Sequence, residues 1–276
     1  MPRYSIAADK DSLPEQASRE LERTVSQLLE TLPARRPLTI GLGGAPGTGK
    51  TTLARACAAR IDATMVLSLD DYYLPRAQRM SLADAVHPLL ANRGVAGTHD
   101  IELLASHLAQ LKNPGHEEIE IPLFDKQQDE RRNRGRFVMK NHVPELVFLE
   151  GWIVGVPPQA ESDLVAPVNA MEIQSDPHAT WRTWVNRALG QYSELLTPLL
   201  DLNWQLVAPD WETIIEWRWA QECQLERPWL KSRDEVAAFL APFQRWCIHA
   251  QQNCRSWADH VITLDHRHGP VERIDP

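Results

Sequence analysis

Residues 44–51 combine glycines, a lysine and a threonine at a spacing that indicates phosphate chemistry. They read Gly-x-x-x-x-Gly-Lys-Thr, the Walker A pattern of a P-loop. Glycines let backbone N–H groups converge on phosphate oxygens, the lysine reaches the β and γ phosphates, and the threonine hydroxyl helps to hold Mg²⁺. The alternative is a glycine-rich turn that only links a strand to a helix. We predict a nucleotide-binding loop of nine residues: Gly44, Ala45, Pro46, Gly47, Thr48, Gly49, Lys50, Thr51 and Thr52.

Carboxylates follow two short apolar runs that resemble buried strands. Glu150 follows residues 146–149, and we predict that it joins Thr51 in holding the metal, directly or through water. Asp70 and Asp71 follow residues 65–69, a strand that we expect to lie beside the P-loop strand. A kinase needs a base for the acceptor hydroxyl near the γ-phosphate, and Asp70 is the candidate. A turn carboxylate or a helix cap is the alternative for each acid.

The charge on a transferring phosphoryl group also requires cations beyond Lys50, which is itself a predicted catalytic residue. Arg218 is the candidate, because helical spacing places it on one face with Trp211, Ile214 and Ile215. The alternative is an arginine whose stem packs while its head reaches water. Other arginines, each expected to be a solvated surface charge, are weaker candidates: Arg182, Arg187 and Arg227.

Two absent patterns narrow the class of P-loop protein. A GTPase needs an Asn/Thr-Lys-x-Asp segment that reads guanine, and the chain contains none. Mechanical ATPases end the second acidic strand with Asp-Glu, whereas here Glu150 is followed by Gly151 and Trp152. These differences favour an ATP-dependent kinase.

Short apolar runs alternate with helical patterns along the chain. The runs cover residues 38–42, 65–69, 146–149, 204–208 and 261–264, the last of which we expect to be the final strand. Helices are expected at residues 51–60 and 181–199, after Asp210, and after a capping box at 232–235, the last with a kink at Pro242. This order predicts an α/β P-loop NTPase fold: a doubly wound parallel sheet with a helical lid and insertions.

The 276 residues suit one large domain. We expect an N-terminal helical extension at residues 1–36, with a helix at 12–32, and a single P-loop kinase domain at 37–276. Two polar stretches near 75–97 and 113–141 are expected to be insertions over the active site. Four cysteines lack metal-ligand spacing and are expected to be reduced thiols.

Composition and charge disfavour two kinds of partner. The net charge of −8 argues against a protein that coats nucleic acid, and no apolar stretch is long enough to cross a membrane. The N-terminus lacks the apolar segment of a signal peptide, so we expect a cytoplasmic protein. The expected partner is a small-molecule acceptor, and the sequence carries no signal of oligomeric state.

Six segments in order resemble the plant-type D-glycerate 3-kinases and their bacterial and fungal relatives, many of them described only as predicted kinases. The segments are residues 44–52, 68–74, 97–100, 122–126, 149–152 and 217–222. The wider group includes uridine kinase, phosphoribulokinase and the P-loop pantothenate kinases. The resemblance to that group implies that Asp70 is the catalytic base, with Tyr72 at the aromatic position, and that Glu150-Gly151 ends the second acidic strand.

The resemblance also implies an acceptor site. It includes the segment Gly-Thr-His-Asp at 97–100 and the Phe-Asp-Lys at 124–126. The substrate candidates are therefore Asp70, Tyr73, His99, Asp100 and Lys126. Each has an alternative: Tyr73 could pack in the core, His99 and Asp100 could cap a helix over residues 101–111, and Lys126 could be a surface lysine. The polar run at 127–134 departs from the serine- and glycine-rich stretch of the plant enzymes.

We therefore expect a kinase that uses ATP and Mg²⁺ to phosphorylate D-glycerate or another small hydroxy acid. Two alternatives stay open: a kinase of another alcohol, such as a nucleoside, a pantothenate-like compound or a sugar, and an ATP-binding regulator with little turnover.

Overall fold

The computed structural model describes residues 37–113, 118–138 and 144–273. The expected N-terminal extension and its helix lie outside the described residues. Among the described residues, no helix combines the length and the apolar character that crossing a bilayer requires.

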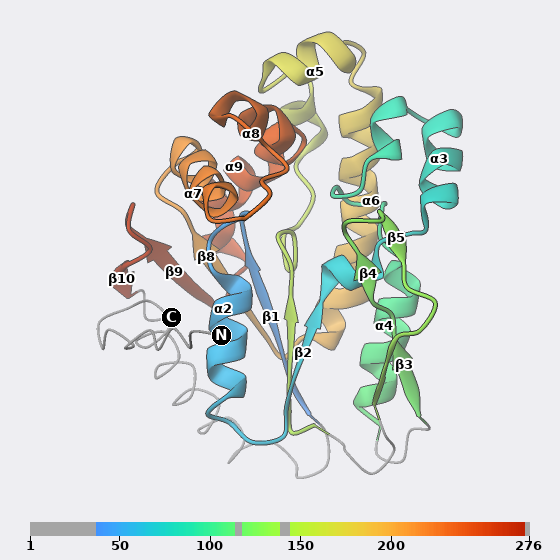
Figure 1. Ribbon diagram of the computed structural model, residues 1–276, viewed down its shortest axis with the longest axis vertical. Helices are drawn as coiled ribbons and strands as arrows, with labels where there is room; N and C mark the ends of the chain where they lie inside the picture. The colour runs from blue at the N-terminus through green and yellow to red at the C-terminus, as the bar shows by residue number, and fades with distance from the viewer. Residues whose placement is uncertain (1–36, 114–117, 139–143, 274–276) are drawn as a thin grey trace.

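A six-stranded sheet forms the centre of the molecule, in the strand order β10-β9-β8-β1-β7-β2 (Figure 1). Neighbouring strands from β9 to β2 are parallel, and β10 is antiparallel to β9. The strands are β1 (Leu38–Gly44), β2 (Thr64–Ser68), β7 (Leu146–Glu150), β8 (Leu202–Val207), β9 (His260–Leu264) and β10 (Pro270–Arg273). Every residue of β1 and β7 is buried, as the continuous apolar runs of central parallel strands predict.

Helices cover both faces of the sheet, which confirms the predicted doubly wound α/β fold. The connection from β1 to β2 runs along the sheet in the opposite direction from those between β2 and β7 and between β7 and β8. Right-handed crossovers therefore place α2 (Lys50–Ala58) on one face and α4 (Ile101–Leu111) and α6 (Thr180–Leu196) on the other (Figure 1). The remaining α-helices are α3 (Arg76–Ala85), α5 (Ala170–Ser175), α7 (Trp211–Cys223), α8 (Arg233–Leu240) and α9 (Gln244–Asn253).

Short elements complete the chain. The 3₁₀ turns are η1 (Leu69–Tyr72), η2 (Pro88–Ala91), η3 (Glu161–Leu164), η4 (Thr197–Leu199), η5 (Ala241–Phe243) and η6 (Cys254–Ser256). Four short strands pair in two antiparallel ribbons, β3 with β6 and β4 with β5. They are β3 (Ile119–Ile121), β4 (Phe124–Asp125), β5 (Glu130–Arg131) and β6 (Arg136–Val138). The expected insertion at 75–97 thus contains α3 and η2, and that at 113–141 contains the ribbons.

Helix starts follow the predicted caps. The side chain of Asp210 accepts a hydrogen bond from the amide of Thr213, and that of Ser232 accepts one from Glu235. Pro242 does more than kink the last helix, because the 3₁₀ turn η5 separates α8 from α9.

Two expectations about the sheet are wrong. The strand that precedes Asp70 does not lie beside the P-loop strand, because β7 lies between β1 and β2. The strand at 260–264 is not the last, because the chain turns at residues 265–269 and adds β10. The order of the strands along the chain does not reveal that β7, about 80 residues after β2, lies between β1 and β2 in the sheet.

Candidate active site

The P-loop joins the end of β1 to the start of α2. Gly47 and Gly49 have φ angles of 85° and 89°, a left-handed conformation that side chains rarely adopt. The Lys50 ammonium is buried and donates a hydrogen bond to the carbonyl of Ala45 over 3.0 Å. The Thr48 hydroxyl donates to the same carbonyl over 2.8 Å. The loop is therefore a preformed cradle, with Lys50 directed back across it.

Glu150 lies at the carboxyl edge of the sheet, next to the P-loop strand as predicted. The register of β7 places it beside Leu42 of β1 and Ser68 of β2. Burial lowers the pKa of Lys50, and the negative charges of Glu150 and Asp70 oppose that shift. The three groups therefore lie close enough for their charges to interact.

The donor set at this edge fits a hydrated magnesium ion. Thr51 is exposed at the first turn of α2, and Glu150 supplies one carboxylate. Among residues 37–113, 118–138 and 144–273, no cluster of three or more His, Cys, Asp or Glu side chains forms a cage for a metal. Mg²⁺ in kinases is held by one or two protein oxygens with phosphates and waters, so a hydroxyl and one carboxylate suffice.

Asp70 lies in η1, directly after β2, and its charge interacts with that of Lys50. Its carboxylate accepts a hydrogen bond of 2.6 Å from the Lys126 ammonium and another from the Tyr73 hydroxyl. Burial acts to raise the pKa of Asp70, but Lys126 and the neighbouring donors bring it below its ordinary value. Asp70 is therefore ionised at neutral pH.

The three residues that follow Asp70 have different surroundings. Asp71 instead accepts a hydrogen bond from the amide of Phe124, and burial raises its pKa. Tyr72 is fully buried, and its hydroxyl lies 3.1 Å from Nδ1 of His107 in α4. Tyr73 is the aromatic residue beside the catalytic candidate, whereas Tyr72 packs in the core.

Residues 97–100 run alongside Tyr73 through a short antiparallel bridge between Tyr73 and His99. The ring of His99 stacks on that of Tyr73 with centroids 4.3 Å apart and is buried. Asp100 is the N-cap of α4, where it accepts from the amide of Leu103 over 3.2 Å. The structure thus makes Asp100 a helix cap and brings His99 toward Asp70.

Arginines that the sequence did not single out hold this site together. Arg131 donates to the carbonyls of Tyr72 and Tyr73 and to the carboxylate of Asp100. It comes from the polar run 127–134 and ties that ribbon to the acceptor segment. No pattern in that run separates Arg131 from its solvated neighbours.

Asp129 anchors the same ribbon from the other side. Its carboxylate pairs with Arg79, which is completely buried, and with Arg93. Arg79 also donates to the carbonyls of Leu74 and Ala91. Lys126 lies in the turn of this ribbon, and its ammonium contacts the carboxylate of Asp70.

The lid candidate Arg218 lies on α7, which packs over the P-loop. A Cβ atom at Gly47 would be 3.4 Å from Trp217 and 3.8 Å from the Arg218 amide. The Arg218 guanidinium forms an ion pair with Glu222, whose side chain is almost completely buried. The helix therefore brings the Arg218 backbone close to the P-loop, while the guanidinium pairs with Glu222 and lies over the ring of Phe239.

The three weaker arginine candidates lie away from this site. Arg187 and Arg227 are exposed. Arg182 is not a surface charge as expected, because it is buried in an ion pair with Asp176.

His268 is a further contact of the P-loop that sequence reasoning missed. Its Nε2 donates a 2.8 Å hydrogen bond to the Gly47 carbonyl, and its ring stacks on Trp217 with centroids 3.8 Å apart. It belongs to the turn between β9 and β10, more than 200 residues from the loop that it contacts. Only the sheet topology brings the two together.

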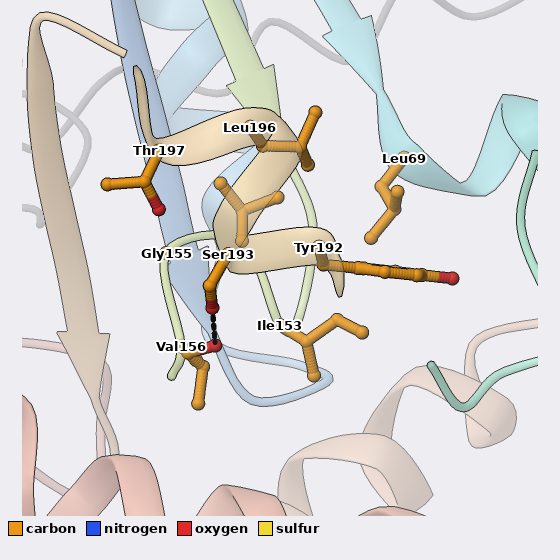
Figure 2. Close-up of a pocket in the computed structure, with 9 residues that line it drawn as sticks. Leu69, Ile153, Gly155, Val156, Tyr192, Ser193, Leu196 and Thr197 are labelled. Atoms are coloured by element: carbon orange, nitrogen blue, oxygen red, sulfur yellow. Dashed lines mark hydrogen bonds between the residues drawn. The ribbon is translucent and has the colours of Figure 1, made fainter. Parts of the chain in front are cut away.

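A small apolar pocket lies below this edge, between the segment after β7 and the last turns of α6 (Figure 2). Its lining includes Leu69, Ile153, Leu196 and the ring of Tyr192. With few polar groups, it is a packing defect of the core rather than the site of phosphate chemistry.

The fold and this cleft define a P-loop kinase, and comparisons with known proteins agree. No protein-family model matches the chain. The uncharacterized kinase mug58 of Schizosaccharomyces pombe is 31% identical over 238 residues, which cover 80% of this chain and 85% of that protein. A uridine kinase of Clostridium tetani is 27% identical over 122 residues, 44% of this chain and 54% of the relative.

Two solved structures have the same fold over nearly their whole length. D-glycerate 3-kinase from Cryptococcus neoformans has a TM-score of 0.80 at 20% identity, and covers 96% of this chain and 99% of its own. The YGR205w protein has a TM-score of 0.77 at 21% identity, and covers 95% and 98%. The chain belongs to the family of P-loop kinases that includes mug58.

Proposed function

We propose that this kinase transfers the γ-phosphate of ATP to a hydroxyl of a small hydroxy acid, with D-glycerate as the first candidate. The observation that carries the proposal is the contact of 2.6 Å between Asp70 and Lys126 at the edge where Lys50 lies. It joins a base for a hydroxyl to a cation suited to a carboxylate. The likeness of the fold to D-glycerate 3-kinase supports the same choice.

Each group has a defined task in this proposal. The P-loop amides and Lys50 bind the β and γ phosphates, and Arg218 approaches the transferring group from α7. Thr51 and Glu150 would hold Mg²⁺, which when bound neutralises charge on the phosphates. Asp70 accepts the proton of the attacking hydroxyl and orients that oxygen toward the γ-phosphate.

Lys126 serves both the base and the acceptor. Its side chain is 59% exposed, so the ammonium can turn toward a carboxylate that enters the cleft. A bound hydroxy acid then shares the Lys126 ammonium with Asp70. Lys126 therefore lowers the pKa of Asp70 less than it does without the acid. A neutral alcohol has no group to make this exchange.

The test measures ADP release with D-glycerate, other hydroxy acids, nucleosides, pantothenate and sugars, for the wild type and Asp70→Asn. We expect release that depends on D-glycerate and falls about 10²- to 10⁴-fold in kcat in the variant, the range for loss of a general base. ATP binding, followed by calorimetry, should stay within a factor of about two to three, because Asp70 lies on the acceptor side.

Other outcomes would redirect the proposal. Release driven by uridine or another neutral alcohol would assign the chain a different acceptor, as the partial similarity to uridine kinases allows. ATP binding without release on any acceptor would indicate a regulator. Hydrolysis that needs no acceptor and survives Asp70→Asn would remove Asp70 from the mechanism.

A further inference from the structure

Tyr192 of α6 is a hub for the segment that carries His99. Its hydroxyl oxygen accepts hydrogen bonds from the amides of Gly97 over 2.8 Å and His99 over 3.3 Å. The same oxygen lies 2.9 Å from Nδ1 of His99. Figure 2 shows the Tyr192 ring along the apolar pocket, with its hydroxyl directed away from Ser193 and Thr197.

These contacts fix the proton on His99. A backbone N–H can only donate, so the two amides use both lone pairs of the Tyr192 oxygen. The phenolic proton is then left for Nδ1, which must accept it. A neutral imidazole that accepts at Nδ1 carries its proton on Nε2.

The surroundings keep both groups in this state. Burial lowers the pKa of His99 to about 3, against the opposing charge of Asp70, so the ring is neutral. Burial also raises the pKa of Tyr192 above its ordinary value, so the hydroxyl keeps its proton to donate.

The Nε2–H group of His99 is an unused donor. It is buried and has no hydrogen-bond partner within residues 37–113, 118–138 and 144–273, and the residue is only 4% exposed. A buried N–H without an acceptor loses its hydration and gains no bond in return, so it destabilises the protein. The ring lies on Tyr73, which bonds to Asp70, and Asp70 is close enough to His99 for their charges to interact. The ring that carries the unused donor therefore lies beside Asp70.

We propose that His99 determines specificity by donating its Nε2–H to a second hydroxyl oxygen of the acceptor, with Tyr192 as the positioning residue that holds this tautomer. The proposal rests on the proposed function and sharpens it. Lys126 matches a carboxylate, Asp70 matches the hydroxyl that is phosphorylated, and His99 matches one more oxygen. The acceptor class is thus a dihydroxy acid rather than a monohydroxy acid.

The first test compares D-glycerate with 3-hydroxypropionate, which keeps the carboxylate and the terminal hydroxyl but lacks the second hydroxyl. Wild type should prefer D-glycerate by about 100-fold or more in kcat/KM, because the smaller acid leaves the buried donor unpaired. His99→Leu removes the donor and should reduce that preference to less than about 10-fold. His99→Gln, whose amide can place an N–H near the same point, should restore most of it.

An equal preference in wild type and His99→Leu would overturn the proposal. ATP affinity and melting temperature of both His99 variants serve as controls for folding. If His99→Leu does not fold, His99→Gln and Tyr192→Phe still test the proposal. Tyr192→Phe keeps the aromatic ring but removes the hydroxyl that fixes the tautomer of His99. That variant should raise KM for D-glycerate more than it lowers kcat.

The second test does not depend on which acceptor is used. Nitrogen-15 NMR of the histidine side chains should find His99 protonated at Nε2 and bare at Nδ1 from about pH 6 to 8, and Tyr192→Phe should mix the two tautomers. A proton at Nδ1 or a cationic ring in the wild type would contradict the assignment. If no acceptor is phosphorylated, the proposed function fails, while this spectrum still settles the state of His99.

Discussion

Asp70 is the proposed base, and the Lys126 ammonium beside it favours its ionised form. Its carboxylate is about one-third exposed, and Lys126 is held over it by a ribbon with anchors on both sides. A base of low pKa is ionised but accepts protons weakly. The pH at which activity is lost on the acid side should therefore depend on Lys126.

Lys126→Met should move the acid limb of the kcat/KM profile to higher pH. Lys126 is the largest influence that lowers the pKa of Asp70, and burial, which raises it, stays in the variant. Because activity requires the ionised carboxylate, a higher pKa means that activity is lost earlier as the pH falls. The measurement is kcat/KM for D-glycerate between about pH 4 and 9.

Lys126→Arg is the matched control for this profile. It keeps the positive charge, so its acid limb should stay near that of the wild type even if the absolute rate falls. If Lys126→Met and the wild type have the same acid limb, a group other than Asp70 governs the loss of activity at low pH.

At the scale of elements, the acceptor segment depends on close packing against α6. Gly97 has a φ of 88°, and a Cβ atom there would be 2.3 Å from the indole of Trp184. That contact is shorter than any real packing distance. The segment and the helix must touch at this point for Tyr192 to reach residues 97 and 99.

Gly97→Ala should destabilise the protein by about 2–4 kcal/mol, from the strained φ and the overlap together. Gly190→Ala, on the same helix, is the control, since its Cβ would meet only Pro158 at 3.8 Å. That change should stabilise by about 0.5–1 kcal/mol, the usual gain in a helix interior. Urea unfolding measures both, and equal effects would contradict the packing argument.

The lid helix yields another prediction. Arg218 lies over the P-loop on α7, beside a buried Glu222 that also accepts from the amides of Trp229 and Leu230. Arg218→Ala should lower kcat about 10²- to 10³-fold, as loss of one transition-state contact does, with little change in KM for the acceptor. A rate within about threefold of wild type would assign Arg218 to lid structure alone.

How far the sequence could predict this site follows from where each residue lies. Strand ends of a parallel sheet meet at one edge, so Glu150 and Asp70 could be placed from their apolar runs. The helix expected at residues 181–199 predicts no role for the Tyr192 hydroxyl, because that hydroxyl finds its partners about 95 residues earlier. Arg131 likewise acts through hydrogen bonds to the backbone carbonyls of Tyr72 and Tyr73, and such bonds leave no pattern in the sequence.

At the scale of the whole molecule, a buried ionic network joins the parts that surround the cleft. Glu172 of α5 forms two short hydrogen bonds with Arg245 of α9, and lies 4.0 Å from Arg182 of α6. Arg182 in turn pairs with Asp176 over 2.9 Å. All four side chains are 3% exposed or less. Figure 1 shows α5, α9 and the N-terminal end of α6 above the carboxyl edge of the sheet.

Glu172→Gln should lower the free energy of unfolding by about 3–5 kcal/mol, because Arg245 and Arg182 would stay buried after losing their shared carboxylate. The control is Glu216→Gln, which breaks the pair between Glu216 and Arg233, two side chains that are half exposed. Water solvates those charges, so the loss should be under about 1 kcal/mol. Urea unfolding of both variants at neutral pH measures the contrast. Similar losses in the two would mean that the buried network does not hold the helices around the cleft together.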